Sequence, residues 1–356
     1  MCDCLSQENP LSIDASASRT PKGVSRAGIR SLLRALMKTN PLLRIALPAL
    51  LILPFLSSCS NHIAAYNDLL VGEPSVETSE PQRGDVHITY LGTNGYLFRS
   101  HDSTIAVDPY FSRIPIRPIA LNAPISPSPQ RIDYATTQAA FPKRVDAWLI
   151  THSHFDHLFD APALQPKFGG KIVSSHTGRF LAQAQGVPLR NLRPSEPGRV
   201  YHFGGAKVSV LEAKHDTIFG MTPYPGKITE PMSSSPNRPK DWLLGTPLAY
   251  LIEMEGKRIY VESGGVPGFL PPVKNVDLAI IGTAVPDSQS RFPGAVRKLN
   301  PRYVLPSHQD NFFLPLENGF QFSTLSNLPQ IKARHKAEQL PGELILMDYF
   351  HTWKLR

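Results

Sequence analysis

Three histidines and one aspartate lie within the six residues 152–157 (HSHFDH), and no other feature limits the fold of this chain so strongly. An apolar run at 147–150 comes directly before them and predicts a buried strand. Packing alone does not explain so many polar side chains in so short a run. We therefore expect a turn at the carboxyl end of this strand, where alternate side chains can point at one metal ion and the next pair at another. Neutral imidazoles with a carboxylate suit zinc.

Short β-branched runs, each bounded by Gly, Pro or Asp, recur from residue 85 onward and predict strands. The expected strands span 85–91, 96–98, 104–107, 147–150, 171–174, 206–211, 248–254, 257–261, 277–281, 302–305 and 343–347. Helical patterns fall between them at 177–185, 294–299 and 328–339. Mixed strands and helices over roughly 270 residues predict one layered α/β domain, residues 85–356.

Two proline-rich segments show no regular pattern. Residues 109–142 contain seven prolines and residues 223–247 contain six. Loops of this length inside a compact domain are usually lids or binding loops. Lids that frame a site are therefore expected, and disordered insertions are the alternative.

The amino end carries an export pattern. Residues 45–56 are wholly apolar but too short to span a bilayer, which needs about 20 residues in a helix. Basic residues precede this run and Leu-Ser-Ser-Cys follows it at 56–59, as is typical of a bacterial lipoprotein signal. We expect a signal peptide over 1–58, with Met37 as the true start and Cys59 as the lipid-modified anchor. A buried core helix is the alternative, although Pro48 and Pro54 argue against it.

Removal of this signal changes what the composition implies. The chain carries 37 Lys and Arg against 29 Asp and Glu, a formal charge of +8, and residues 1–58 hold half of that surplus. Acylation of Cys59 would leave no thiol for a disulfide, because the other two cysteines, Cys2 and Cys4, precede it. The polar residues 59–84 predict a tether. Ser60 after the cysteine favours the outer membrane, so we expect a location in the bacterial cell envelope, facing the periplasm, with no nucleic-acid partner.

The His-x-His-x-Asp-His motif is the signature of the metallo-β-lactamase superfamily, and the chain resembles this family over about residues 85–350. The family's later ligand motifs have counterparts at His215, at the run 262–265 (ESGG) and at His308, each after an expected strand. The Asp-Pro turn at 108–109 is similar to that of the branch containing N-acylphosphatidylethanolamine-hydrolysing phospholipase D. The fold that this resemblance implies is a four-layered αββα sandwich.

The resemblance also implies a ligand set for two divalent metal ions, most simply zinc, with a bridging hydroxide as the nucleophile. The first metal would take His152, His154 and His215, and the second would take Asp156, His157 and His308. Asp156 would also orient the hydroxide and is the expected catalytic residue. The family's bridging aspartate aligns with Gly264, so Glu262, two residues earlier, is the expected bridge; the alternative is that the bridge is missing and the second metal is weak.

Other acidic residues invite weaker interpretations. Asp160 resembles an acid of the same branch that would hold a ligand histidine by a hydrogen bond, and a plain helix cap is equally plausible. Asp216 and Asp310 each adjoin an expected ligand and are expected to support it. Asp108 is expected to fix a turn or to support a ligand histidine. No glycine-rich phosphate loop is present, and Ser263 lacks the context of a nucleophile elbow.

The fold alone does not choose the reaction. The branch resemblance, the expected export and the apolar proline-rich segments favour hydrolysis of a phosphodiester, such as a phospholipid headgroup bond, in a small-molecule or lipid substrate. Hydrolysis of a carboxylic ester, lactone or amide on the same metals is a second hypothesis. A metal-binding envelope lipoprotein without turnover is a third.

Overall fold

The computed structural model describes residues 62–356. The expected signal peptide, Met37 and the anchor Cys59 all lie outside these residues. Between residues 62 and 356, the helices are all too short or too polar to cross a membrane.

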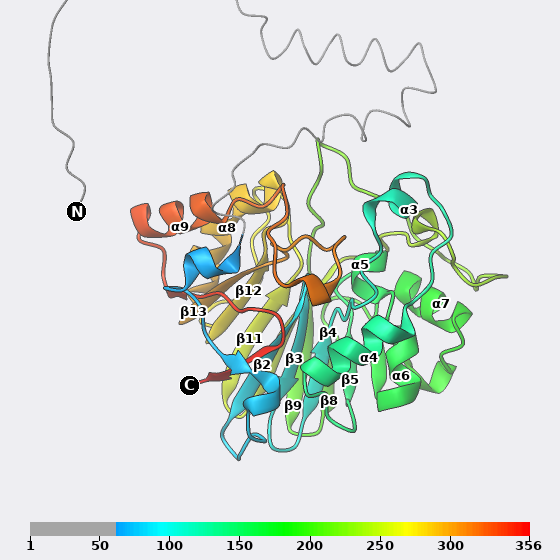
Figure 1. The fold of residues 1–356 in the computed structure, drawn as a ribbon, viewed down its shortest axis with the longest axis horizontal. Helices are drawn as coiled ribbons and strands as arrows, with labels where there is room; N and C mark the ends of the chain where they lie inside the picture. The colour runs from blue at the N-terminus through cyan, green and yellow to red at the C-terminus, as the bar shows by residue number, and fades with distance from the viewer. Residues whose placement is uncertain (1–61) are drawn as a thin grey trace, which may run out of the picture. The chain divides into compact units, whose positions relative to one another are not determined.

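Two β-sheets pack face to face and hold the hydrophobic core between and around them (Figure 1). The first sheet has the order β1-β15-β2-β3-β4-β5-β6-β7 and the second has the order β14-β13-β12-β11-β10-β9-β8. The strands of the first sheet are β1 (Glu73–Pro74), β2 (Val86–Gly92), β3 (Gly95–Arg99), β4 (Thr104–Val107), β5 (Ala147–Leu149), β6 (Lys171–Ser174), β7 (Leu192–Pro194) and β15 (His351–Leu355). The strands of the second are β8 (Val200–Phe203), β9 (Ala206–Glu212), β10 (Leu248–Met254), β11 (Lys257–Glu262), β12 (Leu278–Gly282), β13 (Tyr303–Ser307) and β14 (Glu343–Leu344).

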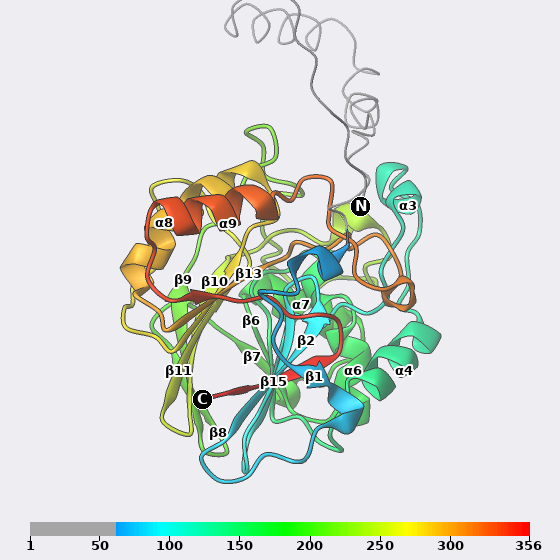
Figure 2. The ribbon, with the colours of Figure 1, turned by 60° about the vertical axis from the view of Figure 1, so that its left-hand side comes forward.

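Helices form an outer layer on each side of the pair of sheets. Figures 1 and 2 show α8 and α9 together on one side, and α4, α6 and α7 on the other. The helices are α3 (Ile116–Ala120), α4 (Pro129–Gln138), α5 (Phe155–Leu158), α6 (Ala161–Phe168), α7 (His176–Ala184), α8 (Pro286–Leu299) and α9 (Leu328–Ala337). Single turns of 3-10 helix occur at Ile63–Tyr66, Ser75–Glu77, Leu189–Asn191, Pro239–Asp241 and Leu316–Asn318. This arrangement confirms the expected four-layered αββα sandwich.

The directions of the strands decide where the long loops lie. Strands β4 to β7 are parallel to one another, and so are β11 to β14. The carboxyl ends of parallel strands share one edge of a sheet, and crevices at such edges are the usual ligand sites of α/β folds. Loops that follow β4, β5, β11 and β13 therefore emerge at shared edges.

Local sequence signals explain several of the helices. Ser128 and Ser175 each accept a hydrogen bond from the backbone N–H three residues on, which caps α4 and α7. Pro286 stands at the first position of α8, where its missing N–H costs nothing. Asn300 ends that helix in a left-handed conformation, with φ 46°.

The expected tether is corrected by the structure. Residues 62–84 pack on the domain: Ile63 and Tyr66 are buried, and β1 pairs with β15 in antiparallel register. The segment is polar in sequence, but its few apolar side chains pack against the hydrophobic core. Its backbone forms the edge strand of the first sheet. The domain therefore begins before residue 85.

The two proline-rich segments differ from each other. Residues 109–142 contain α3 and α4, although their prolines predict no regular structure there. Helix α4 can form because Pro129 stands at its start, where proline is favourable. Residues 223–247 form a long loop with one 3-10 turn. That loop lies against the histidine cluster, since Ser153 N–H donates to the carbonyl of Leu244 and Leu248 N–H donates to the carbonyl of Thr151.

Candidate metal centre

Four loops from the two sheets converge on one place. The loop after β5 carries residues 151–157, and the loop after β9 carries His215. His308 follows β13, and its backbone N–H donates to the carbonyl of Thr93 in the β2–β3 turn. The cluster therefore draws ligands from both sheets.

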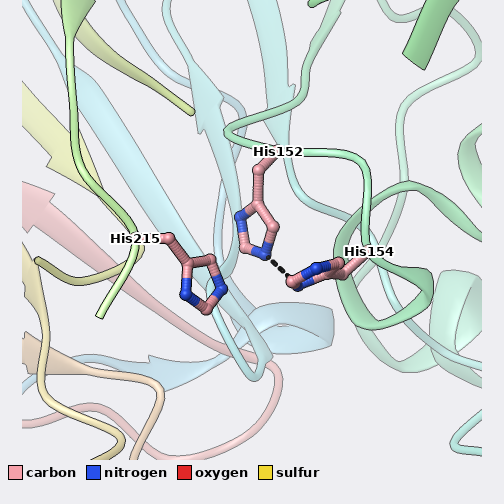
Figure 3. Close-up of side chains that lie close together, drawn as sticks. All are labelled: His152, His154 and His215. Atoms are coloured by element: carbon pink, nitrogen blue, oxygen red, sulfur yellow. Dashed lines mark hydrogen bonds between the residues drawn. The ribbon is translucent and has the colours of Figure 1, made fainter. Parts of the chain in front are cut away.

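His152, His154 and His215 form the first group (Figure 3). One nitrogen from each ring lies within 4.8 Å of the other two, and Nε2 of His152 lies 2.9 Å from Nδ1 of His154. His152 and His154 are buried and His215 is partly exposed. This is the triad that the sequence predicts for the first metal.

Asp156 lies at the centre of a second group. Its Oδ2 lies 3.2 Å from Nε2 of His308 and 3.4 Å from Nε2 of His157. Ligand atoms of His152, Asp156 and His157 also lie within 4.8 Å of one another, so the two groups adjoin. The structure thus brings together six of the seven expected ligands.

Asp108 orients the second group from below. One oxygen accepts hydrogen bonds from Nδ1 of His157 at 2.8 Å, from the hydroxyl of Thr151 and from the side-chain amide of Asn94. The other oxygen accepts from the backbone N–H of Thr151. This leaves Nε2 of His157 free to face Asp156. Asp108 thus does both things expected of it: it fixes a turn, through Thr151, and it supports a histidine, through His157.

Backbone strain also occurs at this centre. Asp108 and His308 have φ of 40° and 58°, in the left-handed region that residues other than glycine rarely adopt. Such strain costs about 1 kcal/mol or more for each residue and persists only where the surroundings impose it. Both residues are held by the hydrogen bonds just described.

The electrostatics favour ligand-ready protonation states in the first group. Burial, reinforced by the neighbouring His157, lowers the pKa of His152 well below its usual range. Burial and the nearby His215 lower the pKa of His154 to about 3. These two imidazoles are therefore neutral at pH 7, which is the form that binds a metal.

The second group behaves as a charged cluster without metal. Burial would raise the pKa of Asp156, but His157 and His308 lower it well below its usual range. Burial would lower the pKa of His157, but Asp156 and Asp108 raise it to about 10. A divalent cation would take over the role of the proton on His157.

Unsatisfied buried atoms test whether these residues fit a metal. Among the described residues, Nε2 of His154, Nδ1 of His308 and Oδ2 of Asp216 are buried without a hydrogen-bond partner. Such atoms are rare in folded proteins unless water or an ion satisfies them. A donor set rich in imidazole with one carboxylate suits zinc or a similar cation.

Glu262 does not join this cluster, which corrects the expected bridge. Both of its oxygens contact the guanidinium of Arg291, and one also accepts a hydrogen bond from the hydroxyl of Tyr260 at 2.7 Å. The carboxylate is fully buried in this pair. Its charge is already balanced, so it is not available to bridge two metals.

Asp160 and Asp310 support loops rather than ligand rings. Asp160 accepts hydrogen bonds from the backbone of Phe111 and from the backbone and hydroxyl of Ser112, so it neither caps α6 nor holds a histidine. Asp310 accepts from the backbone N–H of Thr93, whose carbonyl in turn holds the backbone of His308. Asp310 thus reaches the centre only through this turn.

Two residues near the centre lie outside the expected set. The hydroxyl of Ser263 lies 3.2 Å from Nδ1 of His152 and helps to orient that ring. Asp216, directly after His215, has Oδ1 at 3.2 Å from Nδ1 of that histidine. Burial raises the pKa of Asp216, while His215 and His308 act to lower it. Its adjacency to an expected ligand in the sequence predicts such a supporting position.

Two β-sheets between helical layers, with a histidine–aspartate cluster at the ends of their strands, define a metal-dependent hydrolase of the metallo-β-lactamase class. Residues 87–308, more than half of the chain, match the family described as "Beta-lactamase superfamily domain", and the chain belongs to this superfamily.

The chain is similar to curated proteins named "UPF0173 metal-dependent hydrolase". It is 26% identical to that of Myxococcus xanthus over 261 residues, which cover 70% of this chain and 79% of the relative. It is 24% identical to that of Thermus thermophilus over 273 residues, which cover 74% of this chain and 100% of the relative. A solved metallo hydrolase from Ignicoccus hospitalis is 17% identical, with a TM-score of 0.49, over 76% of this chain and 99% of that one.

Proposed function

We propose that this chain hydrolyses phosphodiesters with two divalent metal ions, most simply zinc, and that a phospholipid headgroup bond is the natural target class. The observation that carries the proposal is the pair of adjoining ligand groups around His152 and Asp156. Each group could hold one ion: the first offers three histidines, and the second offers histidines and a carboxylate.

Two bound cations would lower the pKa of a water molecule and neutralise charge that develops on the substrate oxygens. The chain's own residues prepare this reaction. Asp156 stays ionised, because His157 and His308 lower its pKa, and its carboxylate can accept a hydrogen bond from the attacking water. Asp108 and Ser263 hold the rings of His157 and His152 in place. No protein nucleophile is required.

Apolar side chains near the centre support an amphiphilic substrate. Phe219 and Met221 are 82% and 69% exposed in the tight turn that follows His215. The ring of Phe312 packs at 5.3 Å from that of His308, and the ring of Tyr224 lies 6.1 Å from that of His154. An acyl chain could contact this apolar rim while a phosphate group faces the ligand groups.

The test measures metal content and three substrates side by side. The zinc-loaded protein is assayed on a bis-aryl phosphate, an aryl lactone and a cephalosporin, with Asp156→Asn as the inactive control. We expect turnover of the phosphate and its loss in the variant. Turnover of only the lactone or the cephalosporin would reject the phosphodiester and leave an ester, lactone or amide hydrolase. Full metal loading without any turnover would favour a metal-binding lipoprotein.

We also propose that acylated Cys59 anchors the enzyme in the bacterial cell envelope, where lipid substrates are at hand. The support is the apolar run and the Leu-Ser-Ser-Cys sequence in residues 45–59. Mass spectrometry of the mature amino-terminal peptide from bacterial membranes should find a lipid on Cys59. An unmodified peptide that retains residues 1–58 would contradict this.

A further inference from the structure

The proposed two-metal centre lacks its bridging carboxylate at the usual place. The family's bridging aspartate aligns with Gly264, which has no side chain, and Glu262 is paired with Arg291. A carboxylate beside two neighbouring cations would offset their repulsion in addition to the bridging hydroxide. If the centre is binuclear, we expect another carboxylate to take this role.

Asp216 occupies the space that a side chain at position 264 would take. A Cβ built on Gly264 would lie 2.5 Å from Oδ2 of Asp216 and 3.1 Å from its Cγ. A distance of 2.5 Å is shorter than real Cβ contacts, so Oδ2 of Asp216 already fills the space beside position 264. Side chains at the two positions would exclude each other.

The carboxylate of Asp216 is buried and still has an unused oxygen. The residue is 6% exposed, and Oδ2 has no hydrogen-bond partner between residues 62 and 356. The nearby hydroxyl of Ser288 donates to the carbonyl of Val285 instead. A buried carboxylate oxygen without a donor is costly unless a cation satisfies it.

Asp216 also lies close to residues of the ligand groups. Its Oδ1 is 3.2 Å from Nδ1 of His215, which belongs to the first group. Its Oδ2 lies beside Gly264, and the preceding residue, Ser263, has its hydroxyl 3.2 Å from Nδ1 of His152, a member of both groups. Gly264 has φ 151°, a conformation that other residues rarely adopt, which agrees with a position that carries no side chain.

We propose that Asp216 supplies the carboxylate shared by the two metal ions, in place of the aspartate that the family carries at position 264. The inference rests on the proposed two-metal function and names the ligand that completes it. The carboxylate comes from the residue after a ligand histidine, so the loop after β9 would contribute to both ions.

The first experiment counts metal. Apo full-length protein is titrated with Zn²⁺ by calorimetry, and bound zinc is measured by mass spectrometry after dialysis. We expect two ions in the wild type and one tightly bound ion in Asp216→Asn, with affinity at the weaker site reduced about a hundredfold or more. Glu212→Gln, which removes an exposed carboxylate at the end of β9, should bind two ions.

The second experiment asks whether Asp216 touches the metal or only orients His215. Asp216→Cys is loaded with Co²⁺, and a thiolate ligand then produces a charge-transfer band in the near ultraviolet. The matched control is Thr217→Cys, because the hydroxyl of Thr217 donates to Asp287 and not to a residue of either ligand group. The spectrum of the wild type with Co²⁺ shows any band that arises from the three natural cysteines. Circular dichroism melts establish that each variant is folded.

The outcomes separate this inference from the function on which it rests. A band in Asp216→Cys alone, with loss of one ion in Asp216→Asn, supports the shared carboxylate. Two ions with wild-type affinity in Asp216→Asn, or no band in a folded Asp216→Cys variant, would overturn the role of Asp216 and leave the two-metal centre intact. One ion in the wild type would overturn both.

Discussion

Asp108 shows how one residue outside the ligand set can control a metal group. It fixes His157 and Thr151 at once, through both carboxylate oxygens. In Asp108→Asn the amide can no longer accept all of these hydrogen bonds, so His157 loses its orientation. We expect metal affinity at the second group to fall about 10- to 100-fold.

Calorimetric titration of the Asp108→Asn variant with Zn²⁺ measures this loss. Asp102→Asn is the matched control, because Asp102 lies in the exposed turn before β4 and accepts hydrogen bonds from the nearby Ser100 and Ser103. It should bind zinc like the wild type. Unchanged affinity in both variants would show that Asp108 serves the turn alone.

Asp310 and Arg113 form a fully buried ion pair at 2.8 Å. Asp310→Asn would leave the guanidinium buried without its counter-charge, which costs about 3 to 5 kcal/mol. Breaking the exposed pair of Lys332 and Asp68 by Lys332→Met should cost no more than about 1 kcal/mol. Urea unfolding at pH 7 compares the two variants. Similar losses of unfolding free energy in both variants would mean that burial does not make the Asp310–Arg113 pair more important for stability than an exposed pair.

The same pair predicts a pH dependence. Burial would raise the pKa of Asp310, but Arg113 lowers it below its ordinary value of 3.8. A depressed folded-state pKa contributes stability that is complete above the unfolded pKa and is lost as pH falls through the folded one. The free-energy difference between wild type and Asp310→Asn should therefore be constant above pH 3.8 and shrink below it. A difference that grows on acidification would contradict the pairing.

The sequence predicts the convergence of residues within one motif better than contacts between residues far apart in the chain. His152, His154, Asp156 and His157 share one turn, so their spacing alone predicts their convergence. Glu262 is unavailable as a bridge because it pairs with Arg291, 29 residues away in the sequence. No local sequence pattern predicts that pair. The sequence predicts a supporting position for Asp216 from its adjacency to His215, but its contact with position 264 is visible only in the structure.

At the scale of elements, the close approach of β12 to the loop after β11 depends on Gly282. A Cβ there would overlap the backbone of Ser263 and approach the nitrogen of Gly264 to 2.6 Å. Gly282→Ala should therefore push the 263–264 segment toward the ligand groups and cost about 1 to 3 kcal/mol. Thermal melts and zinc content should both fall.

Gly294 in α8 is the matched control for a glycine-to-alanine change. Its added Cβ would meet only the flexible end of Leu270, at 3.3 Å. Alanine favours a helix over glycine by about 1 kcal/mol. Gly294→Ala should leave stability unchanged or raised, with full zinc content. If both variants melted alike, the contact with Ser263 would not be the cause.

Element prediction succeeded where the side-chain pattern was strong and failed at edges. Buried apolar strands such as β4, β6 and β10 have the expected bounds. The edge strand β8, with only partly buried or exposed side chains, and the carboxyl-terminal β15 were missed, because both are short and neither contains a run of buried apolar residues. Helix α4 was missed because the many prolines of this segment predict a loop, although Ser128 is a good helix-capping residue.

At the scale of the molecule, each ligand group joins the two sheets. His152 and His154 follow β5 of the first sheet, whereas His215 follows β9 of the second. In the other group, Asp156 and His157 follow β5 of the first sheet and His308 follows β13 of the second. A bound cation would therefore cross-link the halves of the sandwich.

Metal should accordingly stabilise the whole domain. A ligand that binds only the folded state at about 100 times its Kd adds about 2.7 kcal/mol. Removal of zinc by a chelator at pH 7 should therefore lower Tm by several degrees, and added Zn²⁺ should restore it. A His154→Ala variant, which loses a ligand of the first group, should show a smaller shift. Equal Tm with and without chelator would reject a cross-linking role.

This stabilisation should grow as pH rises. The pKa of His157 is raised to about 10, so in the apo protein its proton contributes stability that is complete below the unfolded value of 6.5 and is lost as pH approaches 10. Zinc must displace that proton, which becomes easier over the same range. The apo Tm should thus fall between pH 7 and 9 while the gap between holo and apo protein widens. A gap that narrows over this range would show that His157 is not a ligand.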